Sequence, residues 1–256
     1  MRNVANERVV WSLHGNVAEL SCGKLSGRID ASRPNVGLHD VAVDGAQHAT
    51  NLLRVYRSDI TGEKSWPLPV AESYVRGNDL VASYQAIDAW PFSPQLYWRA
   101  DSLSAVDAVL ASASLLVSVQ THLLDTVPQI AVASQVPCDE TLLISVSDGA
   151  QPTAMRIDRA QTISSKNEDC CVVWRLKDVP LSYAEIMPAG DFHAVSVRKE
   201  GKGAAAFEWR LFDEFLEKGV IRRARVHAAI LPRENDVAIA AACCKAIDGL
   251  QLPLTT

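Results

Sequence analysis

The chain has 256 residues, 48% hydrophobic and 21% charged, which excludes an intrinsically disordered protein and allows a sizeable core. Lysine and arginine number 25 against 30 aspartate and glutamate, and the net charge of -5 offers no basic footprint for a nucleic-acid partner. All-β sandwiches often reach this length as one unit, so we expect a single domain over residues 1–256.

No segment is typical of a secretion signal or a membrane span. Residues 1–11 are polar and lack the apolar run of roughly 7–15 residues that a signal peptide carries. Residues 105–119 form the longest weakly polar region, but they are interrupted by Asp107 and several serines and are too short for a transmembrane helix. We therefore expect a cytoplasmic protein without a membrane partner.

Hydrophobic residues recur mostly at every second position, which is the period of a half-buried strand. Residues 18–30 predict a strand loosened by two glycines, and Asp44-Gly45 predicts a hairpin turn. The polar stretch 148–169 is expected to be a long loop. Further strands are predicted at residues 52–56, 80–86, 96–99, 115–121, 129–134, 141–147, 170–176 and 192–198.

The C-terminal region predicts a hairpin followed by a helix. Residues 205–211 and 220–231 both alternate between apolar and polar side chains, and we expect them to pair as the longest hairpin. Asn235 or Asp236 can then cap an amphipathic helix over residues 237–247. Together these patterns predict an all-β fold, a large antiparallel β-sandwich with a short C-terminal helix.

A charged sheet face is predicted on this hairpin. At period two, Arg223, Arg225 and His227 share one face of the second strand. Glu208 and Arg210 would join them from the partner strand. Guanidinium groups match the geometry of carboxylates, phosphates and vicinal hydroxyls, so this face predicts a carbohydrate or small anionic ligand. Alternatively, these residues form cross-strand ion pairs on a solvated surface.

A second candidate site combines aromatic and charged side chains. Trp90 and Tyr97 lie close in sequence to Arg76 and Arg99. Aromatic rings beside carboxylates and guanidinium groups suit a sugar, because pyranose rings present apolar faces and polar edges. The same aromatic residues could instead be ordinary core and loop anchors.

Other site motifs are missing from the sequence. The six histidines show no HxH or HExxH spacing, so no metal site is expected. Neither a GxSxG elbow nor a GxGxxG or GxxxxGK loop occurs, and no cofactor is predicted. The adjacent pairs Cys170-Cys171 and Cys243-Cys244 match neither a redox nor a zinc motif, so we interpret them as small core residues.

Two resemblances add to this reading. The order of strands, the segment from residues 26–30 to 34–38 and the late hairpin resemble the β-supersandwich of galactose mutarotase-like domains. Residues 216–226, followed by Leu231-Pro232-Arg233-Glu234, are similar to the end of an uncharacterised bacterial protein family that has no assigned activity.

The first resemblance implies a carbohydrate-binding domain or a mutarotase- or epimerase-like enzyme. In mutarotases a carboxylate base and histidines act on the anomeric hydroxyl and ring oxygen of the sugar. No Glu and His of this chain align with those positions, and Glu208 with His227, or Glu185 with His193, are the pairs to examine. The alternative is a noncatalytic structural or protein-interaction domain. The sequence leaves open whether the protein is an enzyme, and it does not indicate an oligomeric state.

Overall fold

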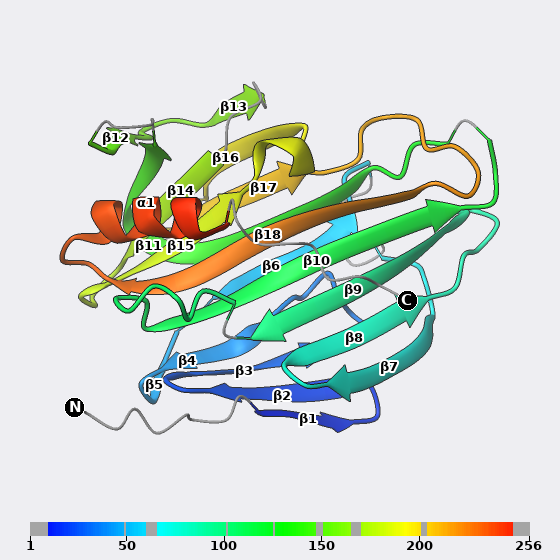
Figure 1. Cartoon of the computed structure of the whole chain (residues 1–256), viewed down its shortest axis with the longest axis horizontal. Coiled ribbons are helices and arrows are strands. Elements are labelled where there is room, and N and C mark those ends of the chain that lie inside the picture. The colour runs from blue at the N-terminus through cyan, green and yellow to red at the C-terminus, as the bar shows by residue number, and fades with distance from the viewer. Residues whose placement is uncertain are drawn as a thin grey trace.

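The computed structural model describes residues 10–48, 50–59, 66–100, 102–124, 126–146, 151–164, 170–200 and 204–247 (Figure 1). The described part is built of antiparallel strands, one α-helix and a short 3-10 turn. In chain order the elements are β1 (Val10–His14), β2 (Val17–Cys22), β3 (Leu25–Asp30), β4 (His39–Val43), β5 (Ala46–Gln47), β6 (Asn51–Arg57), β7 (Val70–Arg76), β8 (Asp79–Tyr84), β9 (Phe92–Ala100), β10 (Ala111–Thr121), β11 (Ile130–Ser145), β12 (Thr153–Arg156), β13 (Gln161–Ser164), β14 (Cys170–Leu176), β15 (Leu181–Met187), η2 (Ala189–Asp191), β16 (Ala194–Glu200), β17 (Ala204–Arg210), β18 (Ile221–Pro232) and α1 (Asp236–Ile247).

Strands β1 to β5 form a small sheet in chain order, and the other strands form one large sheet that folds over on itself. The fold of the large sheet is made by β11, a strand of 16 residues. Its first half pairs with β6 and β17, and its second half pairs with β12 and β14. A register shift between Cys138 and Glu140 separates the pairing of the two halves. One strand therefore supplies both layers of a sandwich.

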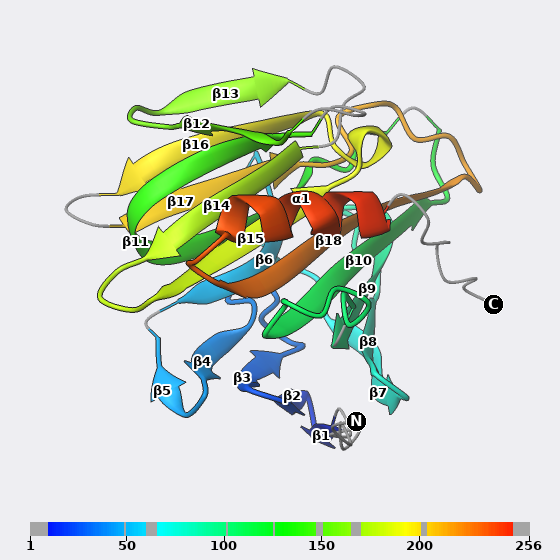
Figure 2. The same ribbon diagram turned by 60° about the vertical axis from the view of Figure 1, so that its left-hand side comes forward.

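We call the two layers the front and back layers. The front layer runs β14-β15-β18-β10-β9-β8-β7, and the back layer contains β16, β17 and β6 (Figure 2). The small sheet continues the back layer, because backbone hydrogen bonds of 2.7 and 2.9 Å join Leu38, just before β4, to Leu52 of β6. The all-β antiparallel sandwich predicted from the sequence is confirmed.

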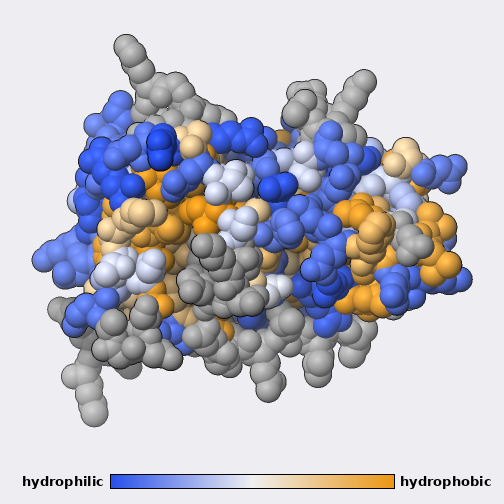
Figure 3. Space-filling model, turned by 90° about the horizontal axis from the view of Figure 1, so that it is seen from above, coloured by the Kyte–Doolittle hydropathy of each residue, from blue (hydrophilic) through white to orange (hydrophobic). Residues whose placement is uncertain are grey.

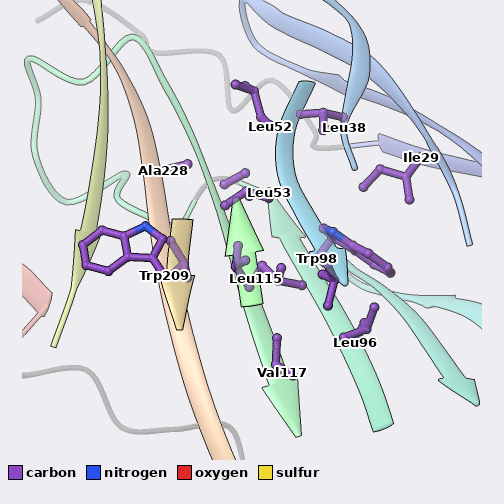
Figure 4. Close-up of a cluster of buried hydrophobic side chains, with 14 of the residues drawn as sticks. Ile29, Leu38, Leu52, Leu53, Leu96, Trp98, Leu115, Val117, Trp209 and Ala228 are labelled. Atoms are coloured by element: carbon purple, nitrogen blue, oxygen red, sulfur yellow. The ribbon is translucent and has the colours of Figure 1, made fainter. Parts of the chain in front are cut away.

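The main core lies between the two layers. Alternation is clear on β2, where every second side chain is buried, and on β3 in the opposite phase. Figure 4 shows this core, with Leu96, Trp98 and Leu115 of the front layer facing Ile29 and Trp209 of the back layer. Removing such apolar surface from water stabilises a fold by roughly 25 cal/mol per Å². The period-two pattern therefore indicates which side of each strand faces the core between the two layers.

The helix α1 covers part of the other side of the front layer (Figure 2). It packs on β11, β14, β15 and β18 in a second cluster that includes Ala229 and Leu231. Its first residue, Asp236, accepts hydrogen bonds from Nε and Nη2 of the Arg175 guanidinium at 2.9 and 3.1 Å and from Ser182 Oγ at 2.7 Å. The predicted C-terminal helix is confirmed, and it leaves the β7–β10 side of the front layer uncovered by α1.

Some local predictions are wrong. Residues 18–30, expected to form one strand, are divided between the two antiparallel strands β2 and β3. The expected hairpin of residues 205–211 and 220–231 does not form, because β17 pairs with β16 and β11 whereas β18 pairs with β10 and β15. The connection between them crosses from the back layer to the front layer. The expected loop 148–169 contains β12 and β13, each four residues long. Among the described residues, no helix has the length and hydropathy needed to span a membrane.

Candidate functional site

Polar side chains gather on the outer side of the front layer, beside the part covered by α1. Strand register places them in rows across the sheet. Ser114 of β10 pairs with Arg99 on one side and with His227 on the other, and Arg99 pairs with Asp79. The next row joins Tyr97, Leu116 and Arg225, and the one after it joins Ser118 to Arg223. We call this surface the open polar face because α1 does not cover it, although only Arg76, Arg99 and Arg223 of its members are not buried. Its members are Arg76, Asp79, Val81, Tyr97, Arg99, Ser114, Leu116, Ser118, Arg223, Arg225 and His227.

His227 is the most unusual side chain of the open polar face. It is 1% exposed, yet neither ring nitrogen has a hydrogen-bond partner among the described residues. Burial, and then the positive charge of Arg225, lower the pKa of His227 to about 3. The imidazole is therefore neutral near pH 7, with one nitrogen able to donate and the other able to accept. A buried polar group without a partner costs about 1–3 kcal/mol, which a bound ligand would offset.

Positive charge is in excess on the open polar face. Arg225 is 8% exposed, and burial lowers its pKa, with Asp191 opposing this effect and Arg99 adding to it. Asp191 also accepts the backbone N–H of Arg225 at 2.8 Å. Arg99 is held by Asp79 through two hydrogen bonds of 2.7 and 2.8 Å. Register also places Glu72 on this side of the sheet, so arginines 76, 99, 223 and 225 face three carboxylates, those of Glu72, Asp79 and Asp191, an excess of one positive charge that favours an anion.

An apolar strip crosses the same face. Val81, Tyr97 and Leu116 form a separate buried cluster on three neighbouring strands. The Tyr97 hydroxyl donates to Gln95 Oε1 at 2.8 Å, and burial raises its pKa. A strip of apolar side chains between hydrogen-bonding groups is the usual composition of a small-molecule site. The strip could contact the C–H face of a sugar while the neighbouring residues bind its hydroxyls.

Five of the seven residues predicted as ligand contacts lie together on this face: Arg76, Tyr97, Arg99, Arg225 and His227. The aromatic and the charged constellations are therefore one surface, although the sequence presented them as two.

Trp90 and Glu208 lie elsewhere. Trp90 is in the main core, where its indole N–H donates to Pro128 O at 3.1 Å and its ring packs against Phe92. Glu208 is in the back layer, where it accepts a hydrogen bond of 2.6 Å from Tyr56 and pairs with Arg198. Both are structural contacts, and the alternative interpretation of core and ion-pair residues holds for them.

Neither expected Glu–His pair forms. Glu208 and His227 are on different layers with the core between them. His193 is a half-exposed residue 4.0 Å from Asp213, whereas Glu185 is fully buried in the core. The pair of Glu208 and His227 depended on the hairpin that the chain does not form.

Glu185 belongs to a hydrogen-bonded cluster inside the sandwich. Its Oε1 accepts from Tyr183 at 2.7 Å and from Ser134, and its Oε2 accepts from Trp209 Nε1 at 2.6 Å. The Ser134 hydroxyl in turn accepts the backbone N–H of Leu53 at 2.9 Å. Burial raises the pKa of Glu185, and the three donors oppose this effect. The cluster links the two layers and is closed to a ligand.

The sequence reasoning missed Ser114, Leu116 and Asp191. The serines of residues 111–121 alternate with apolar residues, and this pattern could have identified a polar face on β10. Asp191 reaches Arg225 from the loop after β15, and no local pattern indicates that contact. In the part of the chain that the structure describes, no group of three or more His, Cys, Asp or Glu side chains is placed to hold a metal ion.

No protein-family model matches the chain, and no curated protein matches it in sequence. Solved structures do match. A proposed mutarotase (YeaD) from Salmonella typhimurium superposes with a TM-score of 0.52 at 7% identity, over 91% of this chain and 96% of that chain. A proposed aldose 1-epimerase from Klebsiella pneumoniae superposes with a TM-score of 0.57 at 9% identity, over 97% and 91% of the two chains. This chain has the galactose mutarotase-like fold.

The resemblance to the β-supersandwich is thereby confirmed as a likeness of fold. The similarity of residues 216–226 to an uncharacterised bacterial family gains no support, because no family model matches. At 7 to 9% identity the activity has to be argued from the residues of the open polar face.

Proposed function

We propose that the open polar face binds a carbohydrate that carries a negatively charged group, such as a sugar acid or a sugar phosphate. The observation that carries the proposal is His227, a buried imidazole without a hydrogen-bond partner in the described chain, set beside a buried arginine. A folded protein keeps such a costly group more readily where a ligand completes it. The galactose mutarotase-like fold supports a sugar as that ligand.

Each part of the face has a role in this proposal. Arg225 and Arg223 bind the anionic group, since guanidinium donors match carboxylate and phosphate oxygens. Tyr97 and Leu116 contact the C–H face of the ring. Asp79 fixes the orientation of Arg99 through its two hydrogen bonds. His227 then hydrogen-bonds a hydroxyl or the ring oxygen of the sugar.

His227 also favours proton transfer as the chemistry, of the mutarotase or epimerase type. In mutarotation a base removes the proton of the anomeric hydroxyl, the bond from the anomeric carbon to the ring oxygen breaks, and the ring oxygen gains a proton. A pKa of about 3 makes His227 a weak base in the free protein. A bound anion would offset the charge of Arg225 and raise this pKa, so the imidazole would gain basicity when the substrate is present.

Thermal unfolding with a panel of sugars tests the proposal. Glucose, galactose, glucuronate, galacturonate and glucose 6-phosphate are compared at millimolar concentration, because a ligand of the folded state stabilises it by RT ln(1 + [L]/Kd). We expect the charged sugars to raise the midpoint and His227→Leu to abolish that rise. The matched control is His14→Leu, which changes an exposed histidine of the small sheet. Anomer exchange of a sugar that binds, followed by NMR, then measures mutarotase activity.

No shift with any of these sugars would overturn the proposal and favour the alternative, a noncatalytic structural or protein-interaction domain. An equal shift in wild type and His227→Leu would show that the sugar binds away from the open polar face. Binding without anomer exchange would leave a carbohydrate-binding protein and remove the catalytic part.

A further inference from the structure

A cleft of about 190 Å³ lies at the end of the sandwich, next to the open polar face. Its walls are the loop after β15, the segment after β17 and the beginning of β18. The residues that carry the argument are Asp191, His193, Phe212, Glu214, Arg222 and Arg223. None of the roles proposed above for the open polar face requires this space.

The cleft and the open polar face are continuous. Arg223 lines the cleft and also lies on the face, in register with Ser118. Asp191 lines the cleft, and its Oδ2 accepts the N–H of Arg225 two residues further along β18. The two regions therefore share Arg223, and Asp191 connects the cleft to the backbone of Arg225.

The charge of the cleft differs from that of the face. Asp191 and Arg223 are shared with the face, and the carboxylate and guanidinium group that the cleft adds, Glu214 and Arg222, pair with each other and add no net charge. Carboxylates accept from hydroxyls, guanidinium groups donate to them, and the half-buried Phe212 offers an apolar surface. These are the contacts of a neutral pyranose ring, whereas the face has an excess of positive charge.

The loop after β15, which lines the cleft, is held in place by contacts with the core and with β18. Phe192 packs edge-on against Trp209 in the core, with ring centroids 5.2 Å apart. The His193 N–H donates to Arg210 O at 2.8 Å, and Asp191 holds the backbone of Arg225. A site whose walls are already ordered loses little conformational entropy when a ligand binds.

Exposed apolar side chains continue from the mouth of the cleft. Phe215, between the lining residues Glu214 and Leu216, is 70% exposed, and so is Leu124 on the neighbouring loop. The two loops are joined by the bridge between Thr126 and Leu216. Figure 3 shows hydrophobic residues at this right-hand end of the molecule, where β10 ends and β18 begins. Apolar patches rimmed by polar groups mark sites of interaction.

We propose that the cleft is a second sugar subsite, so that the ligand of this protein is an oligosaccharide with a charged unit on the open polar face and a neutral unit in the cleft. This inference rests on the proposed function, because the first unit occupies the face described above.

Calorimetric titration with matched pairs of sugars tests the inference. The probes are glucuronate and its disaccharide with glucose, glucuronosyl-glucose, together with galacturonate and galacturonosyl-rhamnose. We expect at least one disaccharide to bind tenfold or more tightly than its acidic monosaccharide. The double variant His193→Ala/Glu214→Ala should remove this advantage and leave the Kd of the monosaccharide unchanged. Glu217→Ala, an exposed glutamate of the same loop outside the cleft, is the matched control.

The outcomes separate the two proposals. If the monosaccharides bind and the disaccharides bind no more tightly, the second subsite is wrong and the proposed function stands. If the advantage of a disaccharide survives in the double variant, the second unit lies outside the cleft and the inference is wrong. If none of the four sugars binds, both proposals fail. Circular dichroism and the unfolding midpoint show whether the double variant is folded.

Discussion

Glu185 and His227 are buried ionisable residues at adjoining positions of the same sheet, but their environments differ. Glu185 of β15 pairs with Ala228, and its neighbour Ile186 pairs with His227 of β18. Glu185 points into the core and is bound by three donors. His227 points to the outer side and has no hydrogen-bond partner among the described residues. The two residues are therefore equally buried but differ in the number of hydrogen-bond partners that the described chain supplies.

This difference matters because dehydration has a cost. A buried polar group loses its hydrogen bonds to water, and hydrogen bonds from the protein offset most of that free-energy cost. The three donors around Glu185 offset this cost in the folded protein, so the Glu185 carboxyl stabilises the fold. The described chain supplies no hydrogen bond to His227, and in the proposed function a ligand supplies it. Three predictions follow from this difference, and each can contradict it.

The largest expected effect is the loss of the Glu185 carboxyl. Glu185→Ala removes the common acceptor of Tyr183, Trp209 and Ser134 and leaves a cavity, so we expect a loss of about 3–5 kcal/mol in the free energy of unfolding. Glu185→Gln is the control, since its amide can still accept from Trp209 and donate to the hydroxyls. Chemical denaturation near pH 5 measures both. A loss below about 1 kcal/mol in Glu185→Ala would show that the cluster does not support the fold.

The pH dependence of stability is expected to run in opposite directions for the two residues. Burial raises the pKa of Glu185, so its contribution is present below the ordinary carboxyl pKa and is lost as the pH rises through the raised value. Burial lowers the pKa of His227 from 6.5 to about 3, so its contribution is present above pH 6.5 and is lost as the pH falls. For His227 the full effect is on the order of 5 kcal/mol.

Denaturation at a series of pH values measures both changes in the free energy of unfolding. Relative to wild type, Glu185→Gln should gain stability above the ordinary carboxyl pKa, and His227→Gln should gain stability below pH 6.5. A wild-type profile that neither variant changes would contradict both assignments.

The smallest expected effect on stability is that of His227→Leu. Replacing an imidazole that lacks partners by an apolar side chain removes the cost of its dehydration, so we expect the free energy of unfolding to stay within about 1 kcal/mol of wild type or to rise. Binding of charged sugars should be lost in the same variant. If stability falls by more than about 2 kcal/mol, His227 is a packing residue of the front layer and the comparison with Glu185 fails.

Much of the fold could be predicted because the alternation of apolar and polar residues along a strand is a local property of the sequence. Successive side chains of a strand point to opposite faces, so the pattern of residues 220–231 places Arg223, Arg225 and His227 on one side whatever strand lies next to them. The same reasoning gives the helix that follows β18 and the half-buried strand character of residues 18–30, although not their division into β2 and β3. These elements agree with their predictions because each depends on a few neighbouring residues.

The neighbours of each strand could not be predicted in this way. Residues 205–211 and 220–231 have matching patterns and a short connection, yet they belong to different layers. The predicted strands 129–134 and 141–147 are parts of the single strand β11, which bends from one layer to the other. Pairing depends on how the whole chain closes around its core, and alternation carries no information about that.

The sequence by itself determined an antiparallel β-sandwich, a terminal helix and the set of residues that share a side of β18. Only the tertiary structure decided that Arg99 and Ser114 lie beside His227, and that Glu208 lies across the core from it. It also decided that one buried acid has three partners while the histidine next to it in the sheet has none within the described chain. The physical reason is that alternation is fixed along one strand, whereas a site is made where strands far apart in the sequence meet.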